Sequence, residues 1–142
     1  ITMLGTPPQI WSILMKNEPS IWKNYSCNIC GCYAEPVPVI EICEKSLRKS
    51  FSNLEKLVDF CETLRNVSCI QHSCPGTCTV LNVPNFHVFI NIKTARKCFL
   101  YQLPKTIQLQ STFRLAGAIS LQDNIYVVYC PVDEEWLLYD SH

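Results

Sequence analysis

The sequence predicts an α+β domain built on an antiparallel sheet, with a cysteine-rich ribbon and about two helices. Runs rich in Val, Ile, Tyr and Phe fill the C-terminal part between Phe113 and Tyr139, and polar turn residues separate them. Apolar stripes at helical spacing occur earlier in the chain. One close pair of cysteines lies between the two helical segments and a second pair follows them. We expect residues 1–142 to form one domain, because this length is sufficient to bury a core.

The composition narrows the class of protein. Twelve basic and twelve acidic residues give a formal net charge of zero, which argues against a nucleic-acid footprint or an anionic membrane surface. No apolar run approaches the ~20 residues that span a bilayer. No signal-peptide pattern is visible after Ile1. We therefore expect an intracellular protein, nuclear or cytoplasmic, without a membrane or nucleic-acid partner.

Two segments have helical patterns. Pro7-Pro8 followed by Gln9–Lys16 predicts a short helix with proline at its first turn, and Ile10, Ile13 and Leu14 form one apolar stripe on it. The clearer helix is Ser52–Leu64. Ser52 or Asn53 is placed to cap it, and its buried stripe consists of Leu54, Leu57, Val58, Cys61 and Leu64.

The remaining runs predict strands. The first two are Ile21–Ser26 and the proline-containing, edge-type run Glu35–Ile42. Phe86–Ile92 alternates apolar and polar residues, as a strand with one apolar face does. The later strands are Lys97–Gln102, Thr106–Gln110, Phe113–Leu121, Ile125–Cys130 and Trp136–Tyr139, with a turn at Gln122–Asn124. The last three form a predicted antiparallel meander.

Ten cysteines in 142 residues indicate either a disulfide framework or a metal site. Cys27-x2-Cys30 and Cys74-x3-Cys78 each offer two closely spaced thiolates beside turn residues, which is typical of zinc knuckles. The spacing leaves alternatives open, because Cys69, His72 or Cys32 lies close enough to replace a member of these pairs. We expect the other cysteines to be thiols in a reducing compartment.

The C-terminal meander resembles the palm of the ubiquitin-specific proteases. Phe113–Ala118 (FRLAGA) is similar to the family's Y-R-L-x-G-V strand, and Trp136–Asp140 (WLLYD) is similar to its W-Y-x-F-D-D segment. Between them, Asn124–Tyr129 (NIYVVY) falls where the family has G-H-Y-x-x-Y. The resemblance implies a truncated protease fold made of the palm and the zinc-bearing fingers, without the catalytic thumb.

The same resemblance favours Cys27, Cys30, Cys74 and Cys78 as the four ligands of a structural zinc ion, although the family usually has two residues between the second pair. It also places Ile125 where the family has its catalytic histidine. An alkyl side chain cannot accept a proton from a thiol. The family's N-x-G-N-x-C box is absent from the sequence, and only Asp140 matches a catalytic position. His72, His87 and His142 do not precede Tyr126.

These observations predict a catalytically inactive domain that acts as a protein-binding, scaffolding or dimerisation module. A protein partner or a second copy would cover the surface that a missing thumb exposes. Trp11, Trp22 and residues 86–99 are candidate contact regions. The alternatives are a reader of ubiquitin or a ubiquitin-like protein, a thiol-dependent deubiquitinase completed by residues outside this chain, and a generic zinc-ribbon adaptor.

Overall fold

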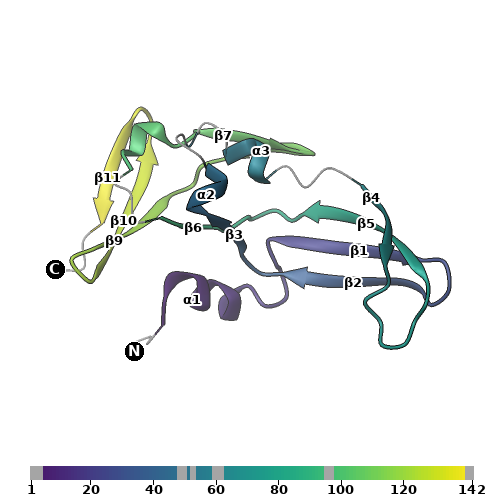
Figure 1. Cartoon of the computed structure of the whole chain (residues 1–142). Helices are drawn as coiled ribbons and strands as arrows, with labels where there is room; N and C mark the ends of the chain where they lie inside the picture. Colours follow the sequence, from purple (N-terminus) through teal and green to yellow (C-terminus); the bar gives the residue numbers. More distant parts are fainter. Residues whose placement is uncertain (1–4, 48–50, 52–53, 59–62, 95–97, 140–142) are drawn as a thin grey trace.

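The fold is elongated, with a β-sheet at each end and the main apolar core between them (Figure 1). A computed structural model describes residues 5–47, 51, 54–58, 63–94 and 98–139. The four-stranded antiparallel sheet has the order β2 (Gly31–Val37), β1 (Ile21–Cys27), β5 (Thr77–Pro84) and β4 (Leu64–Ser68). The three-stranded sheet has the order β11 (Glu135–Tyr139), β10 (Ile125–Val132) and β9 (Ala118–Gln122), and is also antiparallel.

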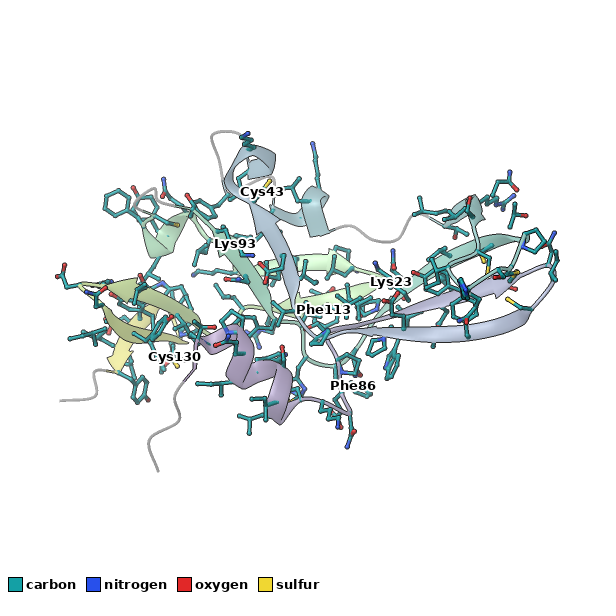
Figure 2. The ribbon with its side chains drawn as sticks, turned by 60° about the horizontal axis from the view of Figure 1, so that its bottom comes forward. Lys23, Cys43, Phe86, Lys93, Phe113 and Cys130 are labelled. Carbon is teal, nitrogen blue, oxygen red and sulfur yellow. The ribbon has the colours of Figure 1, made fainter. Side chains whose placement is uncertain are left out.

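Short elements connect the two sheets. They are β3 (Ile40–Cys43), which pairs in parallel with β6 (Ile90–Lys93), the hairpin β7 (Thr106–Leu109) and β8 (Ser111–Arg114), and the helices α2 (Glu44–Leu47) and α3 (Leu54–Val58). Figure 2, in which Cys130 marks the three-stranded sheet and Lys23 the four-stranded sheet, shows the same separation from a second direction. The fold class is therefore α+β with mostly antiparallel sheets, as predicted.

The main core lies where these connecting elements meet the N-terminal end of β1. Its buried members come from β1, β3, α2, α3 and β7: Ile21, Ile40, Ile42, Leu47, Leu54 and Leu109. Each element contributes only one or two side chains, so none of them buries an apolar face without the others. The base of the four-stranded sheet is thus anchored in the core, while its far end projects from it (Figure 1).

The N-terminal helix α1 (Pro7–Leu14) has proline in its first turn, as predicted, and ends two residues before the predicted end at Lys16. Pro7 at the first helical position has the φ value a helix requires, and the Thr6 backbone N–H donates to Gln9 Oε1 at 2.8 Å. Trp11 packs against Phe89, with ring centroids 5.1 Å apart. The helix is therefore attached to the segment that precedes β6. No helix among the described residues is long and apolar enough to cross a membrane.

The predicted helix Ser52–Leu64 is wrong at its C-terminal end. The helix α3 covers Leu54–Val58, whereas Leu64 begins strand β4. Leu64 pairs with Val80 and Val67 with Cys78, so backbone pairing with β5 outweighs the helical pattern there. Ser52, Asn53 and Cys61 lie outside the described residues.

Other predicted strands are shortened or divided. The run Phe86–Ile92 forms a strand only from Ile90, because the chain first turns at Asn85, whose N–H donates to the Ser20 carbonyl at 3.0 Å. Residues 100–102 of the predicted strand Lys97–Gln102 form a 3₁₀ helix, and the run Phe113–Leu121 is divided between β8 and β9. The hairpin β9–β10 confirms the predicted turn, since Asp123 and Asn124 adopt φ values of 47° and 64°.

Candidate metal centre

The free end of the four-stranded sheet carries two cysteine-containing loops. In the first, Cys27 ends β1 and Cys30 immediately precedes β2. Gly31 completes this tight connection with a φ of 86°, a value that glycine adopts without the steric cost other residues incur. The Ile29 N–H points back to Cys27 Sγ at 3.4 Å. The hairpin thereby brings two thiols and a backbone donor to one side of the loop.

The second loop joins β4 to β5. Cys69 follows β4 directly, and its N–H donates to the Gly76 carbonyl at 3.0 Å, which closes the loop. Inside it, the Cys74 N–H donates to the Gln71 carbonyl at 3.1 Å, and Ser73 adopts a φ of 63°. These turns direct the Cys69 and Cys74 side chains towards the first loop.

The two loops bring four sulfur atoms together. The Sγ atoms of Cys27, Cys30, Cys69 and Cys74 all lie within 4.8 Å of one another. Cys27 Sγ is 3.7 Å from Cys74 Sγ, and Cys30 Sγ is 3.5 Å from Cys69 Sγ. A tetrahedral ion with metal–sulfur bonds of about 2.3 Å would separate its sulfurs by about 3.8 Å. All four are free thiols, so this group can hold a metal ion.

The electrostatics of the group favour thiolates on two of its members. Backbone N–H groups of Cys30 and Ile29 lower the pKa of the Cys27 thiol to about 6. Burial opposes ionisation of Cys69, but the Gln71 N–H and the Tyr33 hydroxyl outweigh it and lower that pKa as well. Such N–H···S contacts stabilise the anionic form that binds metals.

Neighbouring groups raise the pKa values of the other two thiols, Cys30 and Cys74. The pKa of Cys30 is raised, chiefly because its thiol donates to Cys27. At Cys74 the Gly76 N–H lowers the pKa, but burial and the neighbouring Cys69 outweigh it, so the net direction is upward. Four anions cannot share this space without a cation, and a bound dication would allow all four to ionise.

Three of the four predicted ligands lie in this group, and the fourth position differs from the expectation. Cys69 occupies it, whereas Cys78 lies in β5 directly opposite Cys27 and is only 1% exposed. Its Sγ is 3.8 Å from the Tyr33 hydroxyl, and burial raises its pKa to about 11. Cys78 therefore belongs to the apolar layer beneath the four thiols, with Tyr25 and Val80.

The alternatives that the spacing left open have different outcomes. Cys69, one of them, is a member of the group. Cys32 is exposed on β2, with its Sγ 3.6 Å from Ser26 Oγ, and His72 is exposed in the second loop. Neither belongs to the metal-competent group found among the described residues. Cys69 and Cys74 lie in one loop, whereas Cys78 continues the inward-facing alternation of β5 with Val80 and Asn82.

Two tyrosines support the group from below. Tyr25 and Tyr33 stack with ring centroids 4.7 Å apart and planes inclined by 9°. The Tyr33 hydroxyl lies 3.7 Å from Cys69 Sγ, and the Tyr25 hydroxyl donates to Glu35 at 3.0 Å. The pair lies across β1 and β2 on one face of the sheet and places a polar group beside the sulfur of Cys69.

Asn28 joins the two loops through a reciprocal hydrogen-bond pair, and we expect Asn28→Ala to weaken this junction. Its N–H donates to the Thr77 carbonyl at 3.2 Å, and its Oδ1 accepts the Thr77 N–H at 3.0 Å. Removing the amide should lower the free energy of unfolding by about 1 kcal/mol. Thermal unfolding measures the change. Asn24→Ala, at an exposed position of β1, is the matched control. Equal melting temperatures for the two variants would contradict the role of Asn28.

The positions that the family resemblance marks as catalytic lie elsewhere. Ile125 is the first residue of β10, beside the Asp123-Asn124 turn, and is 41% exposed. His72 and His87 are exposed in loops. Asp140 and His142 lie outside the described residues. Among the described residues, the cysteine group and Ile125 thus belong to different sheets, at opposite ends of the fold (Figure 1).

The three-stranded sheet has one face made of apolar side chains. Strand register places Leu121 opposite Tyr126 and Tyr139 opposite Val128, and side chains alternate between faces along each strand. Six apolar residues on this face are 40–58% exposed. We call this set the outer apolar face: Ile119, Leu121, Tyr126, Val132, Leu137 and Tyr139.

Comparison of the chain with protein-family models, curated proteins and solved structures found no match.

Proposed function

We propose that this chain is a catalytically inactive domain of the ubiquitin-specific-protease type that binds other proteins as a scaffolding module. The observation that supports this most directly is the outer apolar face, where six apolar side chains are exposed together. A contiguous apolar patch of roughly 500 Å² is as large as the largest one on a typical monomer, and such patches are often functional. Because these side chains are 40–58% exposed, we infer that this face of the sheet binds another protein and does not only pack within the fold.

We further propose that the ion held by Cys27, Cys30, Cys69 and Cys74 is structural Zn²⁺. Four thiolates form a soft, tetrahedral ligand set, which selects zinc over magnesium or calcium. With four protein ligands the coordination sphere is full, so no position remains for an activated water. The ion would tie the β1–β2 hairpin to the β4–β5 loop and hold the end of the four-stranded sheet rigid.

The assignment of an inactive protein rests on sequence and chemistry. A thiol protease of this type requires a cysteine nucleophile and a base within hydrogen-bonding reach. The nucleophile box is missing from the sequence, and Ile125 replaces the base. Four thiols committed to a metal would not be nucleophiles. A reducing intracellular compartment, nuclear or cytoplasmic, suits a protein that depends on these thiols.

A ubiquitin derivative with a thiol-reactive group at its C-terminus tests the inactive assignment. We expect no covalent adduct with the zinc-loaded chain, and none with Ile125→His, because a base alone does not supply the missing nucleophile. Mass spectrometry of the reaction mixture is the measurement, and an active ubiquitin-specific protease is the positive control. An adduct that a single cysteine substitution abolishes would show an active thiol hydrolase.

A titration with unmodified ubiquitin, combined with light scattering, tests the binding assignment. Saturable shifts of backbone amides in the three-stranded sheet would identify ubiquitin as a partner. A stable dimer that dissociates in Leu121→Ser would identify assembly instead. A chain that stays monomeric at high concentration and binds neither ubiquitin nor the peptide probes described below would contradict the proposed function.

A further inference from the structure

The three-stranded sheet is also the acidic part of the molecule. Between Ala118 and Tyr139 the sequence has four acidic residues and no Lys, Arg or His, so this segment carries a net charge of −4 and leaves +4 for the rest of a neutral chain. The acids are Asp123, Asp133, Glu134 and Glu135. Among the described residues, the ion pair present joins Lys93 to Glu41, on β6 and β3, so these four carboxylates have no cationic partner there.

The four carboxylates border the outer apolar face at both ends. Asp123 lies in the turn between β9 and β10, and Asp133 and Glu134 form the turn between β10 and β11. Since β10 has eight residues, these two turns are separated by roughly 25 Å. Glu135 pairs with Val132, which places its side chain on the apolar face itself. The face is therefore an apolar centre with anionic ends.

The area of the outer apolar face helps to decide whether a second copy of the chain or a smaller partner segment covers it. Six side chains of this size, each about half exposed, offer roughly 500 Å². This value suits the core of a modest interface, but it is smaller than the ~800 Å² that each partner contributes to a standard stable complex. An obligate dimer through this face would require more apolar area. Two copies with these faces together would also bring −4 against −4.

We propose that the outer apolar face docks a protein segment that is itself apolar and carries Lys or Arg at its ends. The apolar centre would supply the buried contact, and the carboxylates at the two turns would select cationic residues and exclude anionic ones. Strand β11 is an edge of the sheet, and Leu137 and Leu138 are exposed on its opposite faces. An extended partner segment could therefore add to this edge as a further strand. This inference rests on the proposed binding function and names the chemistry of the partner.

Three labelled eight-residue peptides test the chemistry, with binding to the zinc-loaded chain followed by fluorescence anisotropy. One has four Leu in the centre and two Lys at each end, the second has the same centre with two Glu at each end, and the third has four Ser in the centre and two Lys at each end. We expect the Leu/Lys peptide to bind roughly tenfold more tightly than either of the others, because only it matches both the apolar centre and the charge. Raising the salt concentration should narrow the difference between the Leu/Lys and Leu/Glu peptides.

Variants of exposed residues localise the binding without disturbing the fold. Leu121→Ser and Leu137→Ser should weaken the Leu/Lys peptide, and Glu134→Lys combined with Glu135→Lys should reverse the preference towards Leu/Glu. Glu18→Lys, an exposed acid before β1, is the matched control and should change nothing. Unchanged melting temperatures would show that each variant is folded.

Other results of these experiments would each contradict a different part of the proposal. Equal affinity for the Leu/Lys and Leu/Glu peptides would overturn the charge selection while the binding function remained. Equal affinity for the Leu/Lys and Ser/Lys peptides would overturn apolar docking. A dimer that dissociates in Leu121→Ser would identify a second copy as the occupant and overturn the basic partner. Binding of no peptide at millimolar concentration would overturn the docking of a basic segment, whereas the proposed function would be contradicted only if the chain also stayed monomeric and did not bind ubiquitin.

Discussion

Cys69→Ala is expected to abolish metal binding, whereas Cys78→Ala should still hold one zinc ion per chain. Cys69 Sγ belongs to the group of four sulfurs that lie within 4.8 Å of one another, and Cys78 is packed beneath it in β5. Loss of one thiolate leaves an incomplete tetrahedron, and the free energy of metal binding, which contributes directly to folding, is lost with it. We expect the melting temperature of Cys69→Ala to fall by roughly 10 °C or more.

Metal analysis after gel filtration, together with thermal unfolding, measures both effects. Chelator treatment of the unsubstituted chain should reproduce the Cys69→Ala melting temperature, and chelator should have little further effect on the variant itself. Cys32→Ala, at an exposed cysteine of β2, is the control and should keep both zinc and stability. Zinc retained in Cys69→Ala and lost in Cys78→Ala would instead support Cys27, Cys30, Cys74 and Cys78 as the ligand set.

The sequence predicted those parts of the fold in which local chemistry and pairing agree. The β9–β10 hairpin is one example, because Asp123 and Asn124 tolerate the positive φ values that a two-residue turn requires. The first knuckle is another, since Cys27 and Cys30 are separated by a single turn. In both cases the residues that decide the structure lie within a few positions of one another.

The fourth member of the cysteine group could not be predicted from spacing, because it depends on where β5 begins. Cys74 and Cys78 are close in sequence, but Thr77 starts the strand, so Cys78 is fixed opposite Cys27 by the β1–β5 register. Cys69 is close to Cys30 only because β4 pairs with the other side of β5. Both facts are long-range pairings that the sequence does not show. The same pairing ended the predicted helix before Leu64.

The outer apolar face could not be distinguished in the sequence from a face that other elements cover. Apolar residues occur on both faces of β9, β10 and β11, which is the pattern of a sheet covered on each side. The exposure of Leu121 and Tyr139 shows that one face is not covered within the described part of the chain. Trp11, Trp22 and residues 86–99 were the predicted contact regions; within them Trp11 packs on Phe89, and Phe86 is 88% exposed.

Gly76→Ala is expected to displace a ligand of the metal although it removes no sulfur. Gly76 is buried where the second loop crosses the first, and a Cβ at this position would lie 2.6 Å from Cys27 Sγ and 2.8 Å from Asn28 Oδ1. Contacts this short force one loop to move. Overpacking of this kind costs roughly 1–3 kcal/mol. The Cys27 sulfur cannot move away without leaving the metal, so zinc affinity should fall together with stability.

Competition with a colourimetric zinc chelator measures the affinity, and thermal unfolding in excess zinc and in excess chelator separates the two effects. The melting temperature of Gly76→Ala should be lower than that of the unsubstituted chain by roughly 3–10 °C in excess zinc. Gly5→Ala is the matched control, because its Cβ would meet other atoms only at 3.5 Å or beyond. If Gly76→Ala bound zinc as tightly as the control, the two loops would not approach as closely as the structure places them, and a four-thiolate site between them would lose its geometric basis.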